Sequence, residues 1–319
     1  MSKCLEDVKN LTFEITNRCN LKCRMCSIWK EREINDLDLV NILSFVSKFE
    51  NRLSISLTGG ECFLHPEFEK IYRYLYFLYI KKRVISINIT TNGYATEKIL
   101  EFLKNSKAIL HGTEFGISLD GLKETHNLQR GMNNAFQKTV KTIRMIKRRY
   151  PFIPISIKTV ITKLNYKDLY SIYELAKKLG CFFEPKFGEY LSRYYHRIKE
   201  TKIIQLSRRE LKHTKIDLLK ILKDKYKGKN NLWIVQLVKF TENPDLNFIK
   251  KCLTPKTSLF IDSRGNIFPC LYQDPVGNIH TGIVEEGKRK AVIEKALKGK
   301  CPKCLSYHGF LKGCNRDII

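Results

Sequence analysis

Ile15-Thr16-Asn17-Arg18-Cys19-Asn20-Leu21-Lys22-Cys23-Arg24-Met25-Cys26 is the most informative segment of this chain, and it overlaps the end of the apolar run Leu11 to Ile15. The apolar run predicts a β-strand, so the cysteines lie in the loop after it. Three residues separate Cys19 from Cys23, and two separate Cys23 from Cys26. A loop of this size can wrap its thiolates around one [4Fe-4S] cluster, in which each iron takes a ligand. Three cysteines leave one iron without a protein ligand, so the sequence predicts a cluster with an open coordination site.

A structural zinc site and a disulfide are the alternatives for these thiols. Zinc takes four closed ligands, and the nearest further thiol, Cys4, lies on the other side of the expected strand. The chain has 11 cysteines, nothing like a secretory signal at its start and no apolar run long enough to span a bilayer. These features indicate metal ligation in a reducing compartment. We therefore expect a cytoplasmic protein with no membrane span.

Short apolar runs alternate with longer amphipathic segments from residue 11 to about residue 187. This alternation predicts repeated βα units with a parallel sheet, and hence an α/β fold built as a partial (β/α)6 TIM-like barrel. In such barrels the functional groups gather at the C-terminal ends of the strands, where the cysteine loop falls. The expected strands are 11–16, 53–58, 84–90, 114–119, 154–161 and 182–187, and the expected helices include 36–49, 98–103, 136–146 and 169–179.

Further motifs follow the later strands. Gly59-Gly60-Glu61 comes directly after the second strand, where glycines let the backbone approach a ligand and the carboxylate can accept hydrogen bonds from an ammonium group. The third strand ends in Thr90-Thr91-Asn92-Gly93 and the fourth in Ser118-Leu119-Asp120-Gly121. Together with the CxxxCxxC spacing, these motifs resemble those of the radical S-adenosylmethionine (radical SAM) superfamily.

The resemblance implies the chemistry of the first site. In that family, three cysteines bind a [4Fe-4S] cluster, and the open iron binds the amino and carboxylate groups of SAM. An electron from the cluster then splits SAM into methionine and a 5′-deoxyadenosyl radical. The residues implied are Cys19, Cys23 and Cys26 for the cluster, Gly59, Gly60 and Glu61 for the amino group of SAM, and Ser118 and Arg130 for further contacts to SAM.

Three positions of this site carry an alternative or a departure. Arg130 lies twelve residues after Ser118, and its guanidinium suits the SAM carboxylate, although a surface role is the alternative. Met25 stands where the family usually has an aromatic residue beside the adenine, and a thioether can fill that space. Cys62 stands where the family often has proline, either as a packed residue or as a group on the substrate side.

A second group of cysteines occupies the C-terminal 63-residue window from 252 to 314. Its spacing, with a turn at 262–266 and the sequence Val276-Gly277-Asn278-Ile279, resembles the SPASM/twitch extension of radical SAM enzymes. Five thiols cannot fully ligate two four-iron clusters, so the resemblance implies a small Cys-rich iron-sulfur domain with one auxiliary [4Fe-4S] cluster. A zinc ribbon is the alternative. The expected ligands are Cys252, Cys270, Cys301 and Cys304, with Cys314 as the rival fourth ligand.

The expected domain organisation has three parts: a radical SAM partial barrel at 1–190, a basic helical linker at 191–249 and a SPASM/twitch-like domain at 250–319. Residues 191–230 hold 13 Lys or Arg against four Asp or Glu, with interleaved apolar residues that predict one or two amphipathic helices. The whole chain carries a formal net charge of +26. Such an excess can indicate an anionic partner such as nucleic acid, but a solvated basic face and biased composition are favoured.

The function expected from the resemblance is an oxidoreductase or peptide-modifying enzyme that abstracts a hydrogen atom from its substrate. A peptide or protein is the favoured substrate, and a small molecule undergoing dehydrogenation is the second choice. The alternative from another class is that the chain is a non-catalytic metal-stabilised RNA-binding protein. Leu271 stands where sulfatase-maturing relatives carry an Asp that acts as a base, which argues against sulfatase maturation. An electron donor such as flavodoxin or ferredoxin is the expected protein partner.

Overall fold

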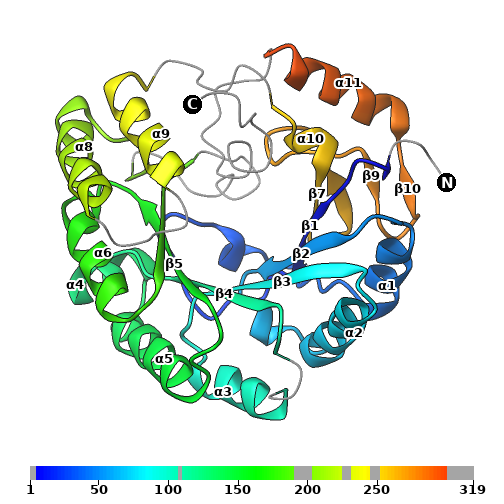
Figure 1. Ribbon diagram of the computed structural model, residues 1–319, viewed down its shortest axis with the longest axis horizontal. Coiled ribbons are helices and arrows are strands. Elements are labelled where there is room, and N and C mark those ends of the chain that lie inside the picture. Colours follow the sequence, from blue (N-terminus) through cyan, green and yellow to red (C-terminus); the bar gives the residue numbers. More distant parts are fainter. Residues whose placement is uncertain (1–4, 107–109, 190–202, 225–230, 245–251, 300–319) are drawn as a thin grey trace.

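Six parallel strands form the centre of the structure, and helices surround them (Figure 1). The computed structural model describes residues 5–106, 110–189, 203–224, 231–244 and 252–299. The six strands pair in chain order, each parallel to the next. They confirm the predicted strands to within one residue at each end. Their bounds are β1 (Asn10–Thr16), β2 (Leu53–Gly59), β3 (Val84–Thr91), β4 (Thr113–Ser118), β5 (Ile155–Ile161) and β6 (Phe182–Phe187).

The helices between the strands form the outer layer (Figure 1). They are α1 (Leu39–Ser47), α2 (Phe68–Ile80), α3 (Thr96–Asn105), α4 (Lys123–Arg130), α5 (Ala135–Arg149) and α6 (Leu169–Lys178), with short 3₁₀ turns η2 (Ile28–Lys30), η3 (Cys62–Leu64) and η5 (Tyr166–Asp168). The first helix begins later than predicted because Asp38 caps it: the Asp38 side chain accepts a hydrogen bond from the Asn41 N–H at 2.8 Å.

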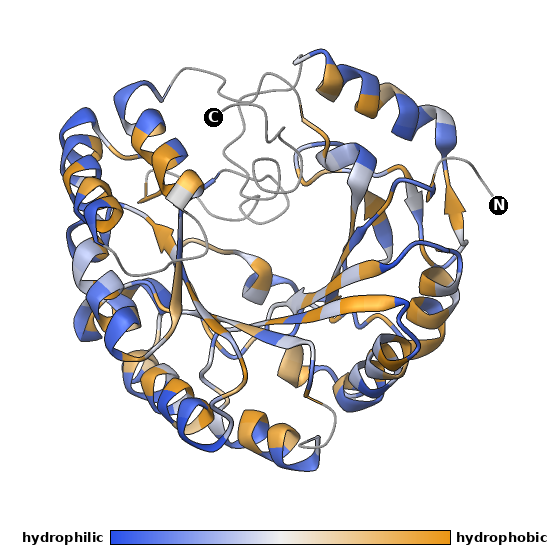
Figure 2. Cartoon of the chain, in the orientation of Figure 1, coloured by the Kyte–Doolittle hydropathy of each residue, from blue (hydrophilic) through white to orange (hydrophobic). Residues whose placement is uncertain are grey.

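The strands have one apolar face and one polar face. In β2, Ile55 and Leu57 are fully buried, whereas Ser56 and Thr58, which point the other way, are partly exposed. The same alternation runs through β5. Figure 2 shows hydrophobic and hydrophilic residues side by side in the surrounding helices, as expected for helices with one face on the sheet. The apolar strand faces and the helices form the main core, and the polar faces line the inside of the barrel.

The basic segment contributes two helices to the outer layer, α8 (Arg208–Lys223) and α9 (Asn231–Glu242). Ser207 and Glu210 form a reciprocal capping box at the start of α8, which packs against α6 and α9. Trp233 of α9 is buried and donates its indole N–H to the Pro185 carbonyl of β6 at 2.6 Å. The described part of the predicted linker therefore continues the helical layer beside the last barrel strand.

The C-terminal region extends the barrel sheet. Its elements are α10 (Thr254–Thr257), β7 (Ser258–Ile261), β8 (Asn266–Phe268), β9 (Gly277–Asn278), β10 (Ile283–Val284) and α11 (Glu286–Leu297). β7 pairs in parallel with β1, and β8 pairs antiparallel with β7 through the predicted turn. Leu259, Ile261 and Ile267 join the main apolar core. One sheet thus contains both the barrel strands and the strands of the C-terminal region, and a separate domain at 250–319 stays a prediction. No helix within the described ranges is long and apolar enough to cross a membrane.

Candidate active site

One pocket at the C-terminal ends of the strands collects nearly all the residues predicted for the first site. We call it the cysteine pocket. Of the nine residues predicted there, eight line it, and only Glu61 does not. The lining residues are Cys19, Leu21, Cys23, Met25, Cys26, Ile28, Trp29, Thr58, Gly59, Gly60, Thr90, Thr91, Asn92, Ser118 and Arg130. Segments from β1 to β4 and the end of α4 therefore meet at one place.

One long-range and two local hydrogen bonds hold the cysteine loop. The Arg24 N–H donates to the Gln129 carbonyl at the end of α4 (2.9 Å). The Trp29 indole N–H lies 3.1 Å from the Cys23 carbonyl and 2.9 Å from the Cys26 carbonyl. These contacts fix the backbone around two cysteines without using their sulfur atoms. The thiols therefore stay available as ligands.

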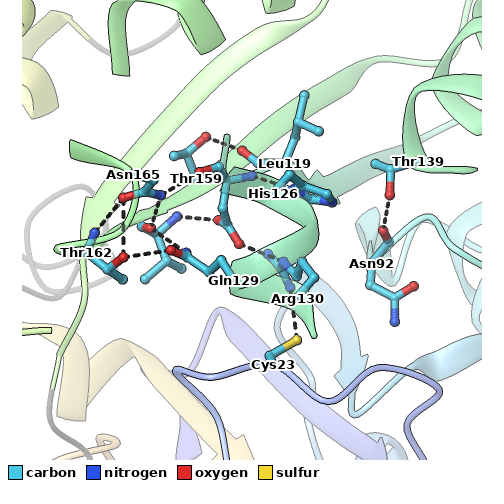
Figure 3. A network of polar contacts seen from close by, with 12 residues as sticks. Cys23, Asn92, Leu119, His126, Gln129, Arg130, Thr139, Thr159, Thr162 and Asn165 are labelled. Atoms are coloured by element: carbon cyan, nitrogen blue, oxygen red, sulfur yellow. Dashed lines mark hydrogen bonds and ion pairs between the residues drawn. The ribbon is translucent and has the colours of Figure 1, made fainter. Parts of the chain in front are cut away.

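Gln129 is itself held by a polar network that runs to the end of β5 (Figure 3). Its side-chain amide donates to the Val160 carbonyl (3.0 Å) and its side-chain oxygen accepts from the Thr162 hydroxyl (2.6 Å). Asn165 donates to the Asp120 and Val160 carbonyls at 2.6 and 2.8 Å. All of these side chains are buried. The network links β5 to the cysteine loop through α4.

Cys23 is buried and Cys19 and Cys26 are partly buried, and this removal from water raises the pKa values of the three thiols. Burial is the main cause for Cys19 and Cys23, and it raises the pKa of Cys26 to about 12, with nearby Cys23 adding to the effect. Thiolates in this place therefore need positive charge beside them. The guanidinium of Arg130 supplies some, since its Nη1 lies 3.8 Å from the Cys23 Sγ (Figure 3).

Arg130 is a buried residue, so the alternative prediction that it lies on the surface is wrong. Its Nε lies 2.6 Å from the Asp120 Oδ2, and the other Asp120 oxygen accepts from the Val160 N–H at 2.8 Å. Burial alone would lower the pKa of Arg130, but Asp120 and Cys23 outweigh it and raise the pKa. The guanidinium is thus permanently charged between Asp120 and the cysteine pocket. Whether it holds the SAM carboxylate stays a prediction.

Glu61 does not line the cysteine pocket, and its binding of the SAM amino group stays a prediction. Its carboxylate is buried and accepts from the Thr91 hydroxyl at 2.8 and 2.9 Å, from the Asn92 N–H at 2.8 Å and from the Phe63 N–H at 3.3 Å. Burial raises its pKa, and the hydrogen bonds from Asn92, Thr91 and Phe63 oppose that rise. The carboxylate therefore positions Thr91 and Asn92, which do line the pocket.

The two glycines are needed for close packing of the backbone. A Cβ at Gly59 would lie 2.4 Å from the Thr16 carbonyl oxygen, and one at Gly60 would lie 2.3 Å from that of Arg18. Any larger residue would push the second strand away from the cysteine loop. Cys62 beside them is fully buried, with its Sγ 3.3 Å from the Thr90 carbonyl oxygen, so the packed alternative is correct for that thiol.

Sequence reasoning missed several residues of this site, namely Trp29, Asp120, Gln129, Thr162 and Asn165. Trp29 carried a usable signal, because it comes three residues after the last cysteine and has one strong donor. Asp120 lies within a quoted motif but was given no role. The other three act through residues far away in the sequence, and no local pattern marks them.

The C-terminal cysteines are described only in part. Cys252 and Cys270 are partly exposed, whereas Cys301, Cys304 and Cys314 lie outside the described residues. The Cys252 N–H donates to the Ala296 carbonyl at 3.2 Å, near the end of α11. This contact brings Cys252 close to the chain five residues before Cys301. The auxiliary cluster and its ligands stay predictions.

The fold and the pocket define a partial α/β barrel with a cysteine-lined pocket over its strands, and the comparisons give its family. The Radical SAM superfamily model matches residues 13–176, which is more than half of the chain. The chain belongs to the radical SAM superfamily. These are enzymes that use a [4Fe-4S] cluster and SAM, and relatives of the SPASM type carry auxiliary clusters.

Individual relatives match most of this chain. It is 28% identical to the antilisterial bacteriocin subtilosin biosynthesis protein AlbA of Bacillus subtilis over 95% of this chain and 66% of AlbA, so it spans about two thirds of that relative's length. It is 26% identical to the AdoMet-dependent heme synthase of Methanosarcina barkeri, over 95% of this chain and 90% of that protein. The structure of anSMEcpe with bound AdoMet and Cp18Cys peptide superposes with a TM-score of 0.66 at 21% identity, over 96% of this chain and 88% of that one. The latter likeness shows the fold.

The residues of the cysteine pocket fit these cofactors. Three buried or partly buried cysteines line one pocket, an arginine adds positive charge beside them, and two glycines leave no room for side chains at its edge. Within the described residues, no three His, Cys, Asp or Glu side chains converge on a single metal ion. A cubane does not need such convergence, because each thiolate binds a different iron.

Proposed function

We propose that this chain uses SAM and a [4Fe-4S] cluster on Cys19, Cys23 and Cys26 to abstract a hydrogen atom from a peptide or protein. The observation that carries the proposal is the cysteine pocket, where eight of the nine residues predicted from motifs come together. Bound together, the cluster and SAM supply a 5′-deoxyadenosyl radical through one-electron cleavage of the sulfonium. This pocket and the family favour an enzyme over the RNA-binding alternative.

The chain's own residues bind and orient these groups. Ser118, at the end of β4, lines the pocket together with Arg130, and the two residues Gly59 and Gly60 also line it. Glu61 holds Asn92, whose side-chain amide donates to the Asn20 side chain in the cysteine loop at 2.8 Å. The carboxylate thus couples the glycine motif to the cluster loop. In this way the fold sets the geometry of the site before any substrate arrives.

A peptide or protein substrate is supported by the relatives. AlbA is named for bacteriocin biosynthesis, and a sporulation killing factor maturation protein of Bacillus subtilis matches over 92% of this chain. Small-molecule chemistry is the second candidate, because the heme synthase matches this chain over 90% of its own length. An auxiliary [4Fe-4S] cluster on four of the five C-terminal cysteines and a flavodoxin or ferredoxin as electron donor complete the proposal.

Anaerobic reconstitution tests the first part of the proposal. Protein reconstituted with iron and sulfide and given dithionite and SAM should release 5′-deoxyadenosine and methionine in equal amounts, measured by liquid chromatography and mass spectrometry. Absence of both products from iron-loaded protein would contradict it. For the substrate class, short peptides encoded beside the gene and iron coproporphyrin are compared as stimulators of 5′-deoxyadenosine formation. Stimulation by a peptide with a change in its mass supports the first candidate.

A further inference from the structure

A lysine inside the barrel lies beside the cysteine pocket and has no role in the site described above. Lys158 is on the polar face of β5, where it pairs in register with Ser118 of β4 and Glu184 of β6. Its Nζ donates to the Thr90 hydroxyl of β3 at 3.1 Å. Ser118 and Thr90 both line the cysteine pocket. The ammonium group therefore lies next to two residues of the pocket wall.

The neighbouring strand leaves space for this side chain. Gly116 of β4 lies between β3 and β5, and a Cβ there would be 2.3 Å from the Lys158 Cε and 2.8 Å from its Nζ. The φ angle of Gly116 is not positive, so the backbone conformation does not require glycine there. Glycine is required because a larger side chain would collide with Lys158. The Lys158 side chain crosses β4 at this gap to reach Thr90.

The surroundings of Lys158 leave part of its hydrogen-bonding capacity unused. An ammonium group has three donors, and among the described residues Thr90 is the acceptor found for it. The charged groups that face it are Glu184, Lys186 and Glu114. Burial lowers the pKa of Lys158, and the two glutamates oppose this without cancelling it. Lys158 is partly buried, and an ammonium group in this situation is stabilised by a further anionic partner.

We propose that Lys158 binds a carboxylate of the substrate inside the barrel and so sets which C–H bond faces the cysteine pocket. The inference rests on the proposed function, because it assigns the substrate class to the same site. A carboxylate suits the position, since it offers acceptors for the remaining donors and an opposite charge at short range. For a peptide, the group is an Asp or Glu side chain or the C-terminus.

Protection of Lys158 from acetylation tests this inference with defined probes. Reconstituted holoprotein with SAM is treated with acetic anhydride in the presence of N-acetylglutamate α-amide, N-acetylalanine or N-acetylglutaminamide. The first carries a side-chain carboxylate, the second an α-carboxylate, and the third has no charge. Acetylation of Lys158 is measured by mass spectrometry, with exposed Lys141 of α5 as the internal reference.

We expect one or both carboxylates to slow acetylation of Lys158 several-fold relative to Lys141, and the neutral amide to leave it unchanged. The carboxylate that protects better identifies side chain or C-terminus. Equal protection by all three compounds, protection by none, or failure of Lys158 to react at all would overturn the inference. In equilibrium dialysis, Lys158→Met should lose binding of the protective carboxylate while Lys141→Met keeps it.

The same protein sample separates this inference from the proposed function. Formation of 5′-deoxyadenosine by the wild-type sample shows that the cluster and SAM chemistry are in place. If that product forms and no carboxylate protects Lys158, the inference fails alone. If the product is absent from iron-loaded protein, the proposed function fails with it.

Discussion

The barrel and the C-terminal region both carry cysteines that suit iron-sulfur clusters, yet they are built differently. The barrel strands are six to eight residues long, whereas β7 to β10 have four, three, two and two. In the barrel, the cysteine loop is held by a long-range hydrogen bond from the Arg24 N–H to the Gln129 carbonyl and by local hydrogen bonds from the Trp29 indole N–H. In the C-terminal region, Cys252 is joined to the helix before Cys301 by a backbone hydrogen bond at Ala296. The comparison teaches that the first site is organised by the fold itself, and it suggests that the second depends more on its ligand.

The largest expected effect comes from removing one cysteine in each region. Both Cys23→Ala and Cys252→Ala should lower the iron content of reconstituted protein from about eight to about four per chain, because each loses one [4Fe-4S] cluster. Only Cys23→Ala should abolish 5′-deoxyadenosine formation, since Cys252 lies outside the cysteine pocket. Iron, sulfide and product analysis check this. Cleavage of SAM by Cys23→Ala protein at the wild-type rate would contradict the assignment of the two regions.

The next largest difference between the two regions should come from removing one positive charge in each and comparing the losses of unfolding free energy. Arg130→Met leaves the Asp120 carboxylate buried without its cation, which should cost about 3–5 kcal/mol of unfolding free energy. Lys288→Met in α11 breaks an exposed pair with Glu285, at 2.7 Å, and should cost less than about 1 kcal/mol. Urea unfolding of the metal-free proteins measures both. Similar losses in the two variants would show that the barrel network is no more stabilising than a surface pair.

Glycine substitutions should have opposite signs in the two regions. Gly60→Ala places a Cβ 2.3 Å from the Arg18 carbonyl oxygen, so the backbone must shift, at a cost of about 1–3 kcal/mol. Gly287→Ala lies in α11 with nothing within 4 Å of the new Cβ and should stabilise by about 0.5–1 kcal/mol. Thermal unfolding checks the signs. A Gly60→Ala protein as stable as the wild type would mean that the glycine motif is not closely packed on the cysteine loop.

The smallest expected effect concerns pH. His65 is buried, its Nδ1 accepts from the Glu67 N–H at 3.0 Å, and its Nε2 lies 2.9 Å from the Leu37 carbonyl oxygen, which fits the neutral ring. Burial lowers its pKa. The unfolded chain therefore takes up a proton as pH falls below about 6.5 while the folded protein does not, and unfolding free energy falls by up to about 1.4 kcal/mol per pH unit. This loss ends when pH reaches the folded pKa.

His65→Asn provides the control for this pH effect. Asparagine can still accept from the N–H two residues later but carries no titratable proton. Urea unfolding between pH 7 and pH 5.5 should show a weaker pH dependence for the variant than for the wild type. An identical pH dependence in the two proteins would remove His65 as a cause of acid sensitivity in the barrel.

Local patterns in the sequence were enough to predict the strands of the barrel and to bring most residues of the cysteine pocket into one set of candidates. The reason is local: alternation of apolar residues marks each strand, and the cysteine, glycine and serine motifs directly follow strand ends that a parallel sheet brings to one edge. Cys19, Gly60 and Ser118 could therefore be assigned together from their positions in the chain. Cys252 and Cys270 could be singled out only as candidates, because cysteine spacing does not fix which thiols share a site.

How the site is held follows from contacts between elements, which the sequence did not predict. Four contacts between different elements of the chain hold the site. They are the ion pair between Asp120 and Arg130, the contact of Arg130 with Cys23, the hydrogen bonds from Thr91 and Asn92 to the Glu61 carboxylate, and the pairing of β7 with β1. Burial then changes what these groups do, since a carboxylate or ammonium removed from water must find its partners within the protein. Which partner it finds depends on the packing of strands and helices, and no local pattern in the sequence specifies it.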